Sequence, residues 1–264
     1  MRAIAAGLSD VGKQRVHNED RFILLPEFSV FVVADGMGGH QSGEVASRMA
    51  ASTIASFFRG DPRFPTSGSV PPPPSTTPPG ERLRQAVSHA NAKIFARADD
   101  SRAHRGMGTT VVAAAFHRAS GELYVAHAGD SRCYRFRDGA LDQLTRDHSL
   151  VSDALLERPD LSAADLAYLP RNVITRALGI APTVDVDLHV EHAAPGDVYL
   201  LCTDGLHSLV TDEEIADILA DDLVLTEACA ALVDHANAAG GKDNITAVLL
   251  RIESDDEPWR AGRA

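Results

Sequence analysis

V-F-V-V-A-D-G-M-G-G-H-Q-S-G spans residues 30–43 and joins an apolar run to one acid, Asp35, and a glycine-rich turn. The run from Val30 to Ala34 predicts a buried strand, and the pattern after the glycines predicts that a helix begins near Glu44. Glycine lets the backbone approach a neighbour closely or take a positive φ, and a helix N-terminus favours nearby anions. The stretch therefore predicts a strand–turn–helix corner, which is either a plain turn or a device that holds Asp35 in place.

The same arrangement recurs: an aspartate beside a glycine or an asparagine stands at the edge of an apolar run. The four copies are A-D-G at 34–36, G-D-S at 129–131, T-D-G at 203–205 and K-D-N at 242–244, and Glu19-Asp20 adds a fifth acidic point. Any single copy is commonly a turn. Clustered carboxylates repel one another unless a cation neutralises them, and a set of oxygen ligands selects hard ions such as Mg²⁺ or Mn²⁺.

Hydrophobic periodicity predicts strands in two batches, each followed by paired helices. The expected strands are 3–9, 21–25, 28–34, 109–116, 123–128, 133–136, 141–144, 184–190, 198–202 and 245–252, and the expected helices are 43–58, 81–99, 211–219 and 225–238. A turn at Pro26-Glu27 would make two of these strands antiparallel neighbours and bring Glu19 and Asp20 close to Asp35. Hairpins outnumber strand–helix–strand crossovers, which favours an α+β layered domain with antiparallel sheets.

Local signals place several boundaries. Asp138-Gly139 predicts a tight hairpin turn, and Thr211 with Glu214 predicts a capping box at a helix start. Residues 60–80 are rich in proline and predict a loop, and residues 147–178 are polar and irregular. We expect one domain over residues 1–252 and a disordered tail over 253–264.

Composition restricts the function classes. The chain has 264 residues, of which 44% are hydrophobic and 23% charged, and its formal net charge is −12. This charge argues against nucleic acid and against an anionic membrane surface as partners. Three scattered cysteines indicate neither a disulfide framework nor a zinc site, and we find no signal peptide and no apolar run of membrane-spanning length. A cytoplasmic protein is expected.

A carboxylate site with two metal ions can activate water and hold a phosphoryl group for in-line displacement. Such a site needs a cation for the phosphate oxygens that do not react. Arg15 is the candidate, because a guanidinium binds these oxygens bidentately; a surface salt bridge is the alternative for this residue.

The motifs together resemble the PPM family of metal-dependent serine/threonine protein phosphatases in its bacterial form. The matching segments, in the family's order, are S-D-V-G-K-Q-R-V-H-N-E-D (9–20), V-A-D-G-M-G-G-H-Q-S-G-E (33–44), G-M-G-T-T (106–110), A-G-D-S-R (128–132), T-R-D-H-S (145–149), R-N-V-I-T-R-A-L-G (171–179), C-T-D-G-L (202–206) and G-K-D-N-I-T (241–246). The resemblance implies a four-layer α-β-β-α sandwich, two antiparallel sheets flanked by helices, with metals at one end.

The resemblance also implies a role for each matching residue. Asp35 would bridge two metal ions, and the carbonyl of Gly36 would help to bind one of them. Asp204 and Asp243 would complete the ligands of the first ion.

Further positions follow in the same way. Glu19 and Asp20 would hold metal-bound waters, and Arg15 would grip the phosphate. Asp130, with Asp204, would bind a third, weaker ion, so that two or three Mn²⁺ or Mg²⁺ ions are expected. Residues 147–178 would contain a flap that influences substrate choice.

One departure concerns the general acid. Many eukaryotic members have a histidine where this chain has Met37, as bacterial members commonly do; His40 is close in sequence, and a metal-bound water is the alternative proton donor. Asn244 is expected to order the Asp243 turn. The neighbours Asp147-His148-Ser149 are not a catalytic triad but a structural turn, because adjacent residues cannot align as nucleophile, base and orienter. Cys202 is expected to be a small core residue.

These observations predict a phosphatase that hydrolyses phosphoserine and phosphothreonine by direct attack of a metal-activated hydroxide. Phosphoproteins, a Ser/Thr protein kinase and the substrates of that kinase are the expected partners, and a monomer is expected. Two alternatives stay open: a catalytically silent PPM-fold module that binds phosphoproteins or a kinase, and a two-metal hydrolase of small phosphate esters or nucleic acid. The silent module is disfavoured by an intact set of Arg15, Asp35, Asp204 and Asp243, since silent copies would be expected to lose a metal-binding acid.

Overall fold

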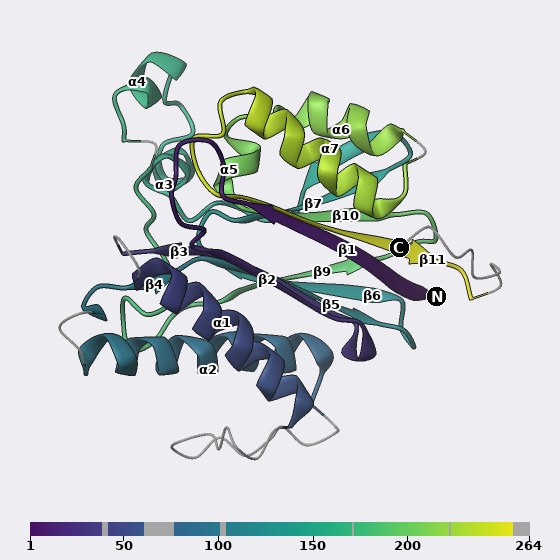
Figure 1. Ribbon diagram of the computed structural model, residues 1–264, viewed down its shortest axis with the longest axis horizontal. Coiled ribbons are helices and arrows are strands. Elements are labelled where there is room, and N and C mark those ends of the chain that lie inside the picture. Colours follow the sequence, from purple (N-terminus) through teal and green to yellow (C-terminus); the bar gives the residue numbers. More distant parts are fainter. Residues whose placement is uncertain (39–41, 61–76, 101–103, 171, 222, 256–264) are drawn as a thin grey trace.

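The protein is a sandwich of two antiparallel β-sheets, with helices on both outer faces (Figure 1). The computed structural model describes residues 1–38, 42–60, 77–100, 104–170, 172–221 and 223–255. The predicted fold class, two antiparallel sheets flanked by helices, is confirmed.

The first sheet has the strand order β1-β11-β10-β7-β8 and is antiparallel throughout. Its strands are β1 (Arg2–Asp10), β7 (Arg132–Arg137), β8 (Ala140–Gln143), β10 (Val198–Cys202) and β11 (Ile245–Glu253). The second sheet has the order β2-β3-β5-β6-β9, and the short β4 pairs with β3 beyond the end of that path. Its strands are β2 (Asp20–Leu25), β3 (Val30–Met37), β4 (Gly108–Thr109), β5 (Val111–His117), β6 (Glu122–Ala128) and β9 (Asp187–His192).

Helices form the outer layers (Figure 1). On the second sheet lie α1 (Ser42–Arg59) and α2 (Pro79–Asp99); the first sheet is covered by α5 (Asp204–His207), α6 (Asp212–Ala220) and α7 (Leu225–Ala238). Two further helices, α3 (Leu150–Glu157) and α4 (Ala163–Ala167), lie at one end of the sandwich, on the left in Figure 1. The two strands β2 and β3 are joined by a 3₁₀ turn, η1 (Pro26–Phe28).

Alternation along β3 shows why these layers form. Val30, Val32 and Ala34 are buried under α1 and α2, whereas Phe31 and Val33 are buried between the two sheets. Successive side chains of a strand point to opposite faces, so a strand that is apolar at every position must be covered on both faces. The sheet therefore needs a helical layer on one side and the second sheet on the other.

Several predicted boundaries are confirmed, among them β10, α7 and the capping box at the start of α6, where Thr211 Oγ1 accepts from the Glu214 amide. The predicted hairpin turn is also present, with positive φ at Asp138 (52°) and Gly139 (81°).

Three strand predictions were wrong in extent. The strand expected over 109–116 is divided at Thr110 into β4 and β5. The strand expected to end at Ala34 continues to Met37, because Gly36 and Met37 pair with β4. The strand expected over 184–190 is β9, which begins at Asp187. Its apolar Leu188 and Val190 are partly exposed, since they lie on an edge strand.

Some predictions fall outside the described residues. These are the position of His40, most of the proline-rich segment at 60–80 and the tail beyond residue 255. Among the described helices, none combines the length and the apolar character that a transmembrane segment requires.

Candidate functional site

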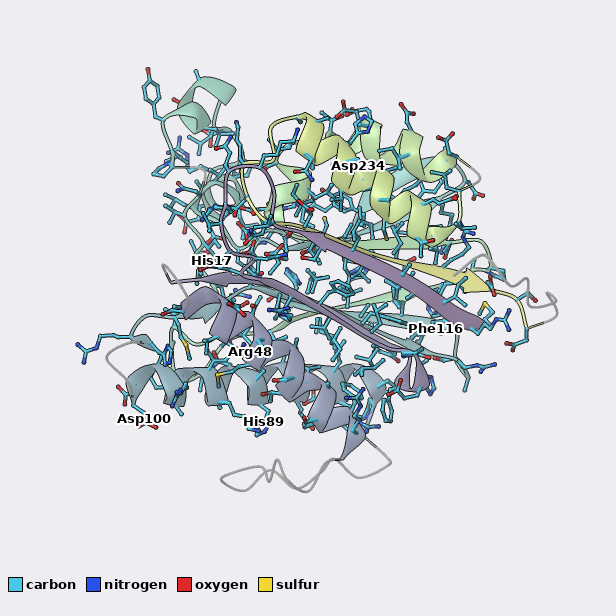
Figure 2. All side chains as sticks on the ribbon, viewed as in Figure 1. His17, Arg48, His89, Asp100, Phe116 and Asp234 are labelled. Atoms are coloured by element: carbon cyan, nitrogen blue, oxygen red, sulfur yellow. The ribbon has the colours of Figure 1, made fainter. Side chains whose placement is uncertain are left out.

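The acids singled out in the sequence meet at one end of the sandwich. Asp20 starts β2 and lies in register with Asp35 on β3. Asp130 follows the end of β6, Asp204 follows the end of β10, and Asp243 precedes the start of β11. The antiparallel pairing of these strands brings the five positions to the same edge, on the left in Figure 1, and Figure 2 labels His17 in the adjoining loop.

Neighbouring strands fix the backbone of Asp35. Its carbonyl oxygen accepts hydrogen bonds from Thr109 Oγ1 (2.7 Å) and from the Thr110 amide (2.8 Å). Its own amide donates to Thr110 Oγ1 (3.2 Å). The two threonines belong to the G-M-G-T-T segment, so the function of that motif at this site is to hold Asp35.

Gly36 is required by close packing rather than by an unusual φ. A Cβ atom at this position would lie 2.2 Å from the carbonyl oxygen of Gly43 and 2.6 Å from that of Glu19. The Gly36 amide donates to the same Glu19 carbonyl (3.2 Å). Positive φ is instead found at Gly38 (138°), just beyond β3. The glycine-rich turn thus brings β2, β3 and α1 into backbone contact beside Asp35.

Burial and mutual repulsion disfavour the charged forms of these acids. Burial, followed by the charges of Asp20 and Asp204, raises the pKa of Asp35 well above its usual range. Burial also raises the pKa of Asp20 to about 7, against hydrogen bonds from Thr246 and Thr203 that lower it. For Asp204, burial and the nearby Asp243 raise the pKa, partly offset by a hydrogen bond with Asp35. Such a cluster is costly without a compensating positive charge.

Two carboxylate oxygens have no protein partner. Asp20 Oδ1 and Asp204 Oδ1 are buried and make no hydrogen bond within the described part of the chain. The other Asp20 oxygen, Oδ2, accepts from the hydroxyls of Thr203 (2.9 Å) and Thr246 (2.7 Å). Buried oxygens left free in a group of repelling carboxylates fit hard divalent cations such as Mn²⁺ or Mg²⁺. The two threonine hydroxyls were missed in the sequence, although both stand in the quoted motifs.

The remaining predicted residues lie around this group. Burial, then the charge of Asp204, raises the pKa of Asp130 to about 7. Glu19, also partly buried, has a raised pKa, with Arg15 acting against the shift. Arg15 Nη2 lies 2.6 Å from Asp243 Oδ2, and the side chains are 51% and 36% exposed. The structure therefore brings all eight predicted site residues to one end of the fold, with Arg15 on the solvent side.

The residues 147–149 are structural, as predicted. Asp147 accepts two hydrogen bonds from Arg132 (2.9 and 2.8 Å), and His148 Nδ1 accepts from the Gly129 amide (3.0 Å). Ser149 caps α3 through the Ser152 amide. His148 thus anchors the backbone next to Asp130.

A buried pair of histidines was not predicted from the sequence, where no motif distinguishes the two residues. The rings of His127 and His148 stack with centroids 4.6 Å apart and planes 6° apart, and Asp187 lies beside them. Stacked rings direct their nitrogen lone pairs along parallel planes rather than toward one point. An Arg176 nitrogen also lies 3.0 Å from His148 Nε2 and 2.5 Å from Asp187 Oδ1. We interpret this cluster as a structural contact and not as a metal site.

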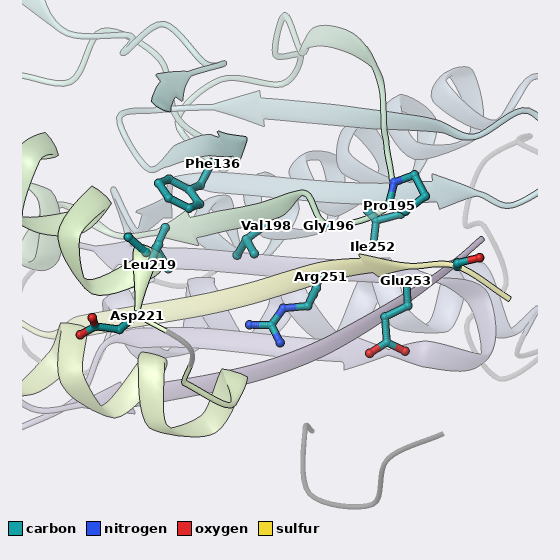
Figure 3. Close-up of a pocket in the computed structure, with 11 residues that line it drawn as sticks. Phe136, Pro195, Gly196, Val198, Leu219, Asp221, Arg251, Ile252 and Glu253 are labelled. Atoms are coloured by element: carbon teal, nitrogen blue, oxygen red, sulfur yellow. The ribbon is translucent and has the colours of Figure 1, made fainter. Parts of the chain in front are cut away.

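A groove of about 410 Å³ lies at the opposite end of the first sheet (Figure 3). Its lining includes Phe136, Val198, Leu219, Asp221, Arg251 and Glu253. Two of the charged groups there have partners: Glu253 accepts from Arg2 Nη2 (2.7 Å), and Arg251 Nη2 donates to the Leu223 carbonyl (3.2 Å). Asp221 is exposed to solvent. Among its described lining residues, the groove therefore has none of the buried, unpartnered carboxylate oxygens that distinguish the other end.

Comparison with known proteins agrees with this geometry. The protein phosphatase 2C family matches residues 12–249. A serine/threonine phosphatase of Listeria welshimeri, stp, is 37% identical over 246 residues, which cover 92% of this chain and 93% of the relative. The structure of the serine/threonine phosphatase PstP/Ppp of Mycobacterium tuberculosis superposes with a TM-score of 0.81 at 32% identity, covering 96% and 100% of the two chains.

A second solved structure, the catalytic domain of the serine/threonine protein phosphatase PstP in complex with two manganese ions, has a TM-score of 0.79 at 32% identity and covers 96% of this chain and 99% of its own. The family match spans nearly the whole chain and includes every acid of the cluster. The chain belongs to the protein phosphatase 2C family, as a bacterial-type member of the PPM serine/threonine phosphatases.

Proposed function

We propose that the acidic cluster is the active site of this metal-dependent phosphatase, and that it hydrolyses phosphoserine and phosphothreonine in proteins. The observation that carries the proposal is the group of buried carboxylates with two oxygens, Asp20 Oδ1 and Asp204 Oδ1, that have no partner in the described chain. A fold does not keep such a group for stability, because each buried acid disfavours the folded state unless it is neutralised.

Asp35, Asp204 and Asp243 would hold two Mn²⁺ or Mg²⁺ ions, with the Gly36 carbonyl as a further ligand. When bound, these ions activate a water molecule for attack on phosphorus and neutralise charge on the phosphoryl oxygens. The threonine hydroxyls on Asp20 Oδ2 leave its Oδ1 to face the cluster. Asp20 and Glu19 would then orient water molecules at the site.

Arg15 would bind the phosphate. Its guanidinium is half exposed and rests against Asp243 at the edge of the cluster, so it can turn a donor pair toward an incoming phosphate. Asp130 would hold a third ion together with Asp204, in line with the contribution of Asp204 to its raised pKa. Met37 has no proton to donate, so the leaving group must take its proton from another source, such as water.

The finer assignments follow from the family. We propose one catalytic domain over residues 1–252, with a substrate-influencing flap at 147–178. The tail predicted to begin at residue 253 is wrong at its start, because Glu253 lies in β11 and Asp255 forms an ion pair with Arg118. The loop predicted to reach residue 80 is likewise wrong at its end, because α2 begins at Pro79. We further propose a monomer in the cytoplasm whose partners are a Ser/Thr protein kinase and the phosphoproteins that this kinase modifies. The basis for the partners is the phosphatase activity that the family shares.

The test is hydrolysis of a phosphothreonine peptide by the purified full chain with Mn²⁺, measured as released phosphate. Parallel samples contain EDTA or the variant Asp35→Asn, which keeps the shape of the side chain and removes its charge. Activity that needs both the metal and Asp35 would support the proposal. A folded wild-type protein without turnover in Mn²⁺ or Mg²⁺ would contradict it and favour a silent binding module.

A further inference from the structure

The loop of residues 11–19 is held in place by one side chain from a distant part of the sequence. Asn244 Nδ2 donates to the carbonyl oxygens of Val11 (3.0 Å) and His17 (2.9 Å). Asn244 Oδ1 accepts from the amide of Glu19 (2.7 Å). One buried amide, 5% exposed, therefore satisfies backbone groups at both ends of the loop.

The turn before Asn244 supports the middle of the same loop. The Gly241 carbonyl accepts from the amides of Lys13 (2.8 Å) and Gln14 (3.1 Å). A Cβ atom at Gly12, where φ is +76°, would lie 2.2 Å from the carbonyl oxygen of Asp243. The loop thus lies directly against the turn that presents Asp243.

Packing contributes little to the order of this loop. Residues 13–17 are all exposed, and Val16 is 85% exposed. The ion pair between Arg15 and Asp243 is also exposed, and such pairs contribute little. A segment without buried apolar side chains depends on its hydrogen bonds for a defined conformation. Asn244 provides three of them.

We propose that Asn244 is a positioning residue for phosphate binding: by pinning the loop 11–19 it fixes Arg15 beside Asp243, so that the phosphate-binding guanidinium and the metal-binding acid keep one geometry. The inference rests on the proposed function. It replaces the expectation that Asn244 merely orders its own turn, since all three side-chain hydrogen bonds go to the loop. A contact to the turn itself is made by its backbone amide, which donates to Asp243 Oδ1 (2.8 Å).

A double-mutant cycle tests the coupling. We expect Asn244→Ala to lower kcat/KM for a phosphothreonine peptide about 10- to 100-fold, as is typical for residues that orient a functional group. In the Arg15→Ala background, the same change should cost less than about threefold, because the residue that it positions is already gone. Inhibition by inorganic phosphate should weaken in Asn244→Ala as it does in Arg15→Ala.

Two measurements separate this role from others. Hydrogen exchange of the Lys13, Gln14 and Glu19 amides should quicken in Asn244→Ala, whereas calorimetric binding of Mn²⁺ should stay within about threefold of wild type. Asn91→Ala is the matched control for stability: Asn91 is 1% exposed and also bonds three backbone groups, the Gly179 amide and the carbonyls of Ala181 and Pro182. If Asn244→Ala does not fold, Asn244→Ser removes less of the side chain and enters the same cycle.

The outcomes are distinguishable. Two results with an active wild-type protein would overturn the inference. The first is that the effects of Asn244→Ala and Arg15→Ala on kcat/KM are additive. The second is that Asn244→Ala reduces Mn²⁺ affinity more than about tenfold, which would assign Asn244 to the support of Asp243 instead. The inference would also be overturned if Asn91→Ala were coupled to Arg15→Ala as strongly as Asn244→Ala is. The loss of activity would then reflect general destabilisation. An inactive wild-type protein would overturn the proposed function itself, and this inference with it.

Discussion

The pKa values of buried acids are shifted in opposite directions at the two ends of the sandwich. At the end where β2, β6 and β10 meet the acidic cluster, Asp20, Asp35, Asp130 and Asp204 have raised pKa values. At the other end, Asp197 is also buried, at 2% exposed, yet its pKa is lowered.

The difference lies in the partners. Burial alone would raise the pKa of Asp197, but two hydrogen bonds from Arg137 (2.7 and 2.6 Å) and others from the Ala194 amide and the Tyr199 hydroxyl outweigh it. Among the described residues, the acids of the cluster accept no comparable pair of guanidinium hydrogen bonds: Arg132, near Asp130, is paired with Asp147, and Arg15 lies at the exposed edge. One end of the fold is therefore completed by its own side chains, whereas the other is arranged for a cation from outside. Substitutions in the acidic cluster should therefore mainly lower activity, whereas substitutions at Asp197 should mainly lower stability.

The largest expected effect is at the centre of the cluster. Asp35→Asn should lower kcat/KM for a phosphothreonine peptide by about a thousandfold or more, because it removes the charge of the acid that is proposed to hold the metal ions. The same variant should unfold at a higher temperature than wild type in EDTA at pH 8, since a buried charge has been removed. Calorimetry in EDTA checks this, and a less stable variant would contradict the comparison.

The opposite result is expected at the far end. Asp197→Ala leaves the Arg137 guanidinium without its buried acid, which should cost about 3 kcal/mol of unfolding free energy. Urea denaturation measures this loss. Below its unfolding temperature the variant should keep the kcat/KM of wild type within about twofold, because none of the lost contacts reaches the acidic cluster. A large loss of activity in folded protein would show that the two ends are not independent.

Variants at the two ends should differ in how much a bound metal ion stabilises them. Free Mn²⁺ at about 100 times its Kd should stabilise the wild-type protein by about 2.7 kcal/mol, seen as a rise in Tm. Asp197→Ala should start from a lower Tm and show the full rise. Asp35→Asn should show little of it. An equal rise in both variants would place the ion outside the cluster.

The smallest expected effect is a difference in pH dependence. In metal-free protein, the folded-state pKa of Asp130, about 7, exceeds that of the unfolded chain, so this group removes stability as pH rises from about 4 to 7. The gain in Tm of Asp130→Asn over wild type should therefore grow from near zero at pH 4 to its full value at pH 7.5. The stability that Asp197 contributes is instead present above pH 4 and lost as pH falls through its lowered pKa.

Differences between variant and wild type are needed here because His148, with a pKa lowered to about 4, titrates in the same range. Because His148 binds its proton less readily in the folded protein than in the unfolded chain, it lowers stability as pH falls below the pKa of an unfolded histidine, about 6.5. This pH dependence is opposite in sign to the contribution of Asp130. Metal-free thermal scans of wild type, Asp130→Asn and Asp197→Asn across pH 3.5–8 provide the test. A gain in Asp130→Asn that does not vary with pH would contradict the raised pKa.

What the sequence determined by itself was the set of acids and the class of fold. The apolar runs that lead into Asp35 and Asp204 are local patterns, and so are the boundaries of β10 and α7, since the hydrophobic period is set by neighbouring residues. The family resemblance added an order of motifs, and the family match confirms it. The roles of the single site residues stay predictions.

The contacts that support these residues depend on the folded arrangement of distant segments. Asn244 reaches a loop more than 200 positions away in the sequence. The hydroxyls on Asp20 come from Thr203, directly after β10, and from Thr246 on β11. The extension of β3 likewise depends on pairing with the distant β4. Such contacts join segments that no local pattern relates, because antiparallel pairing and layer packing bring them together only once the chain has folded.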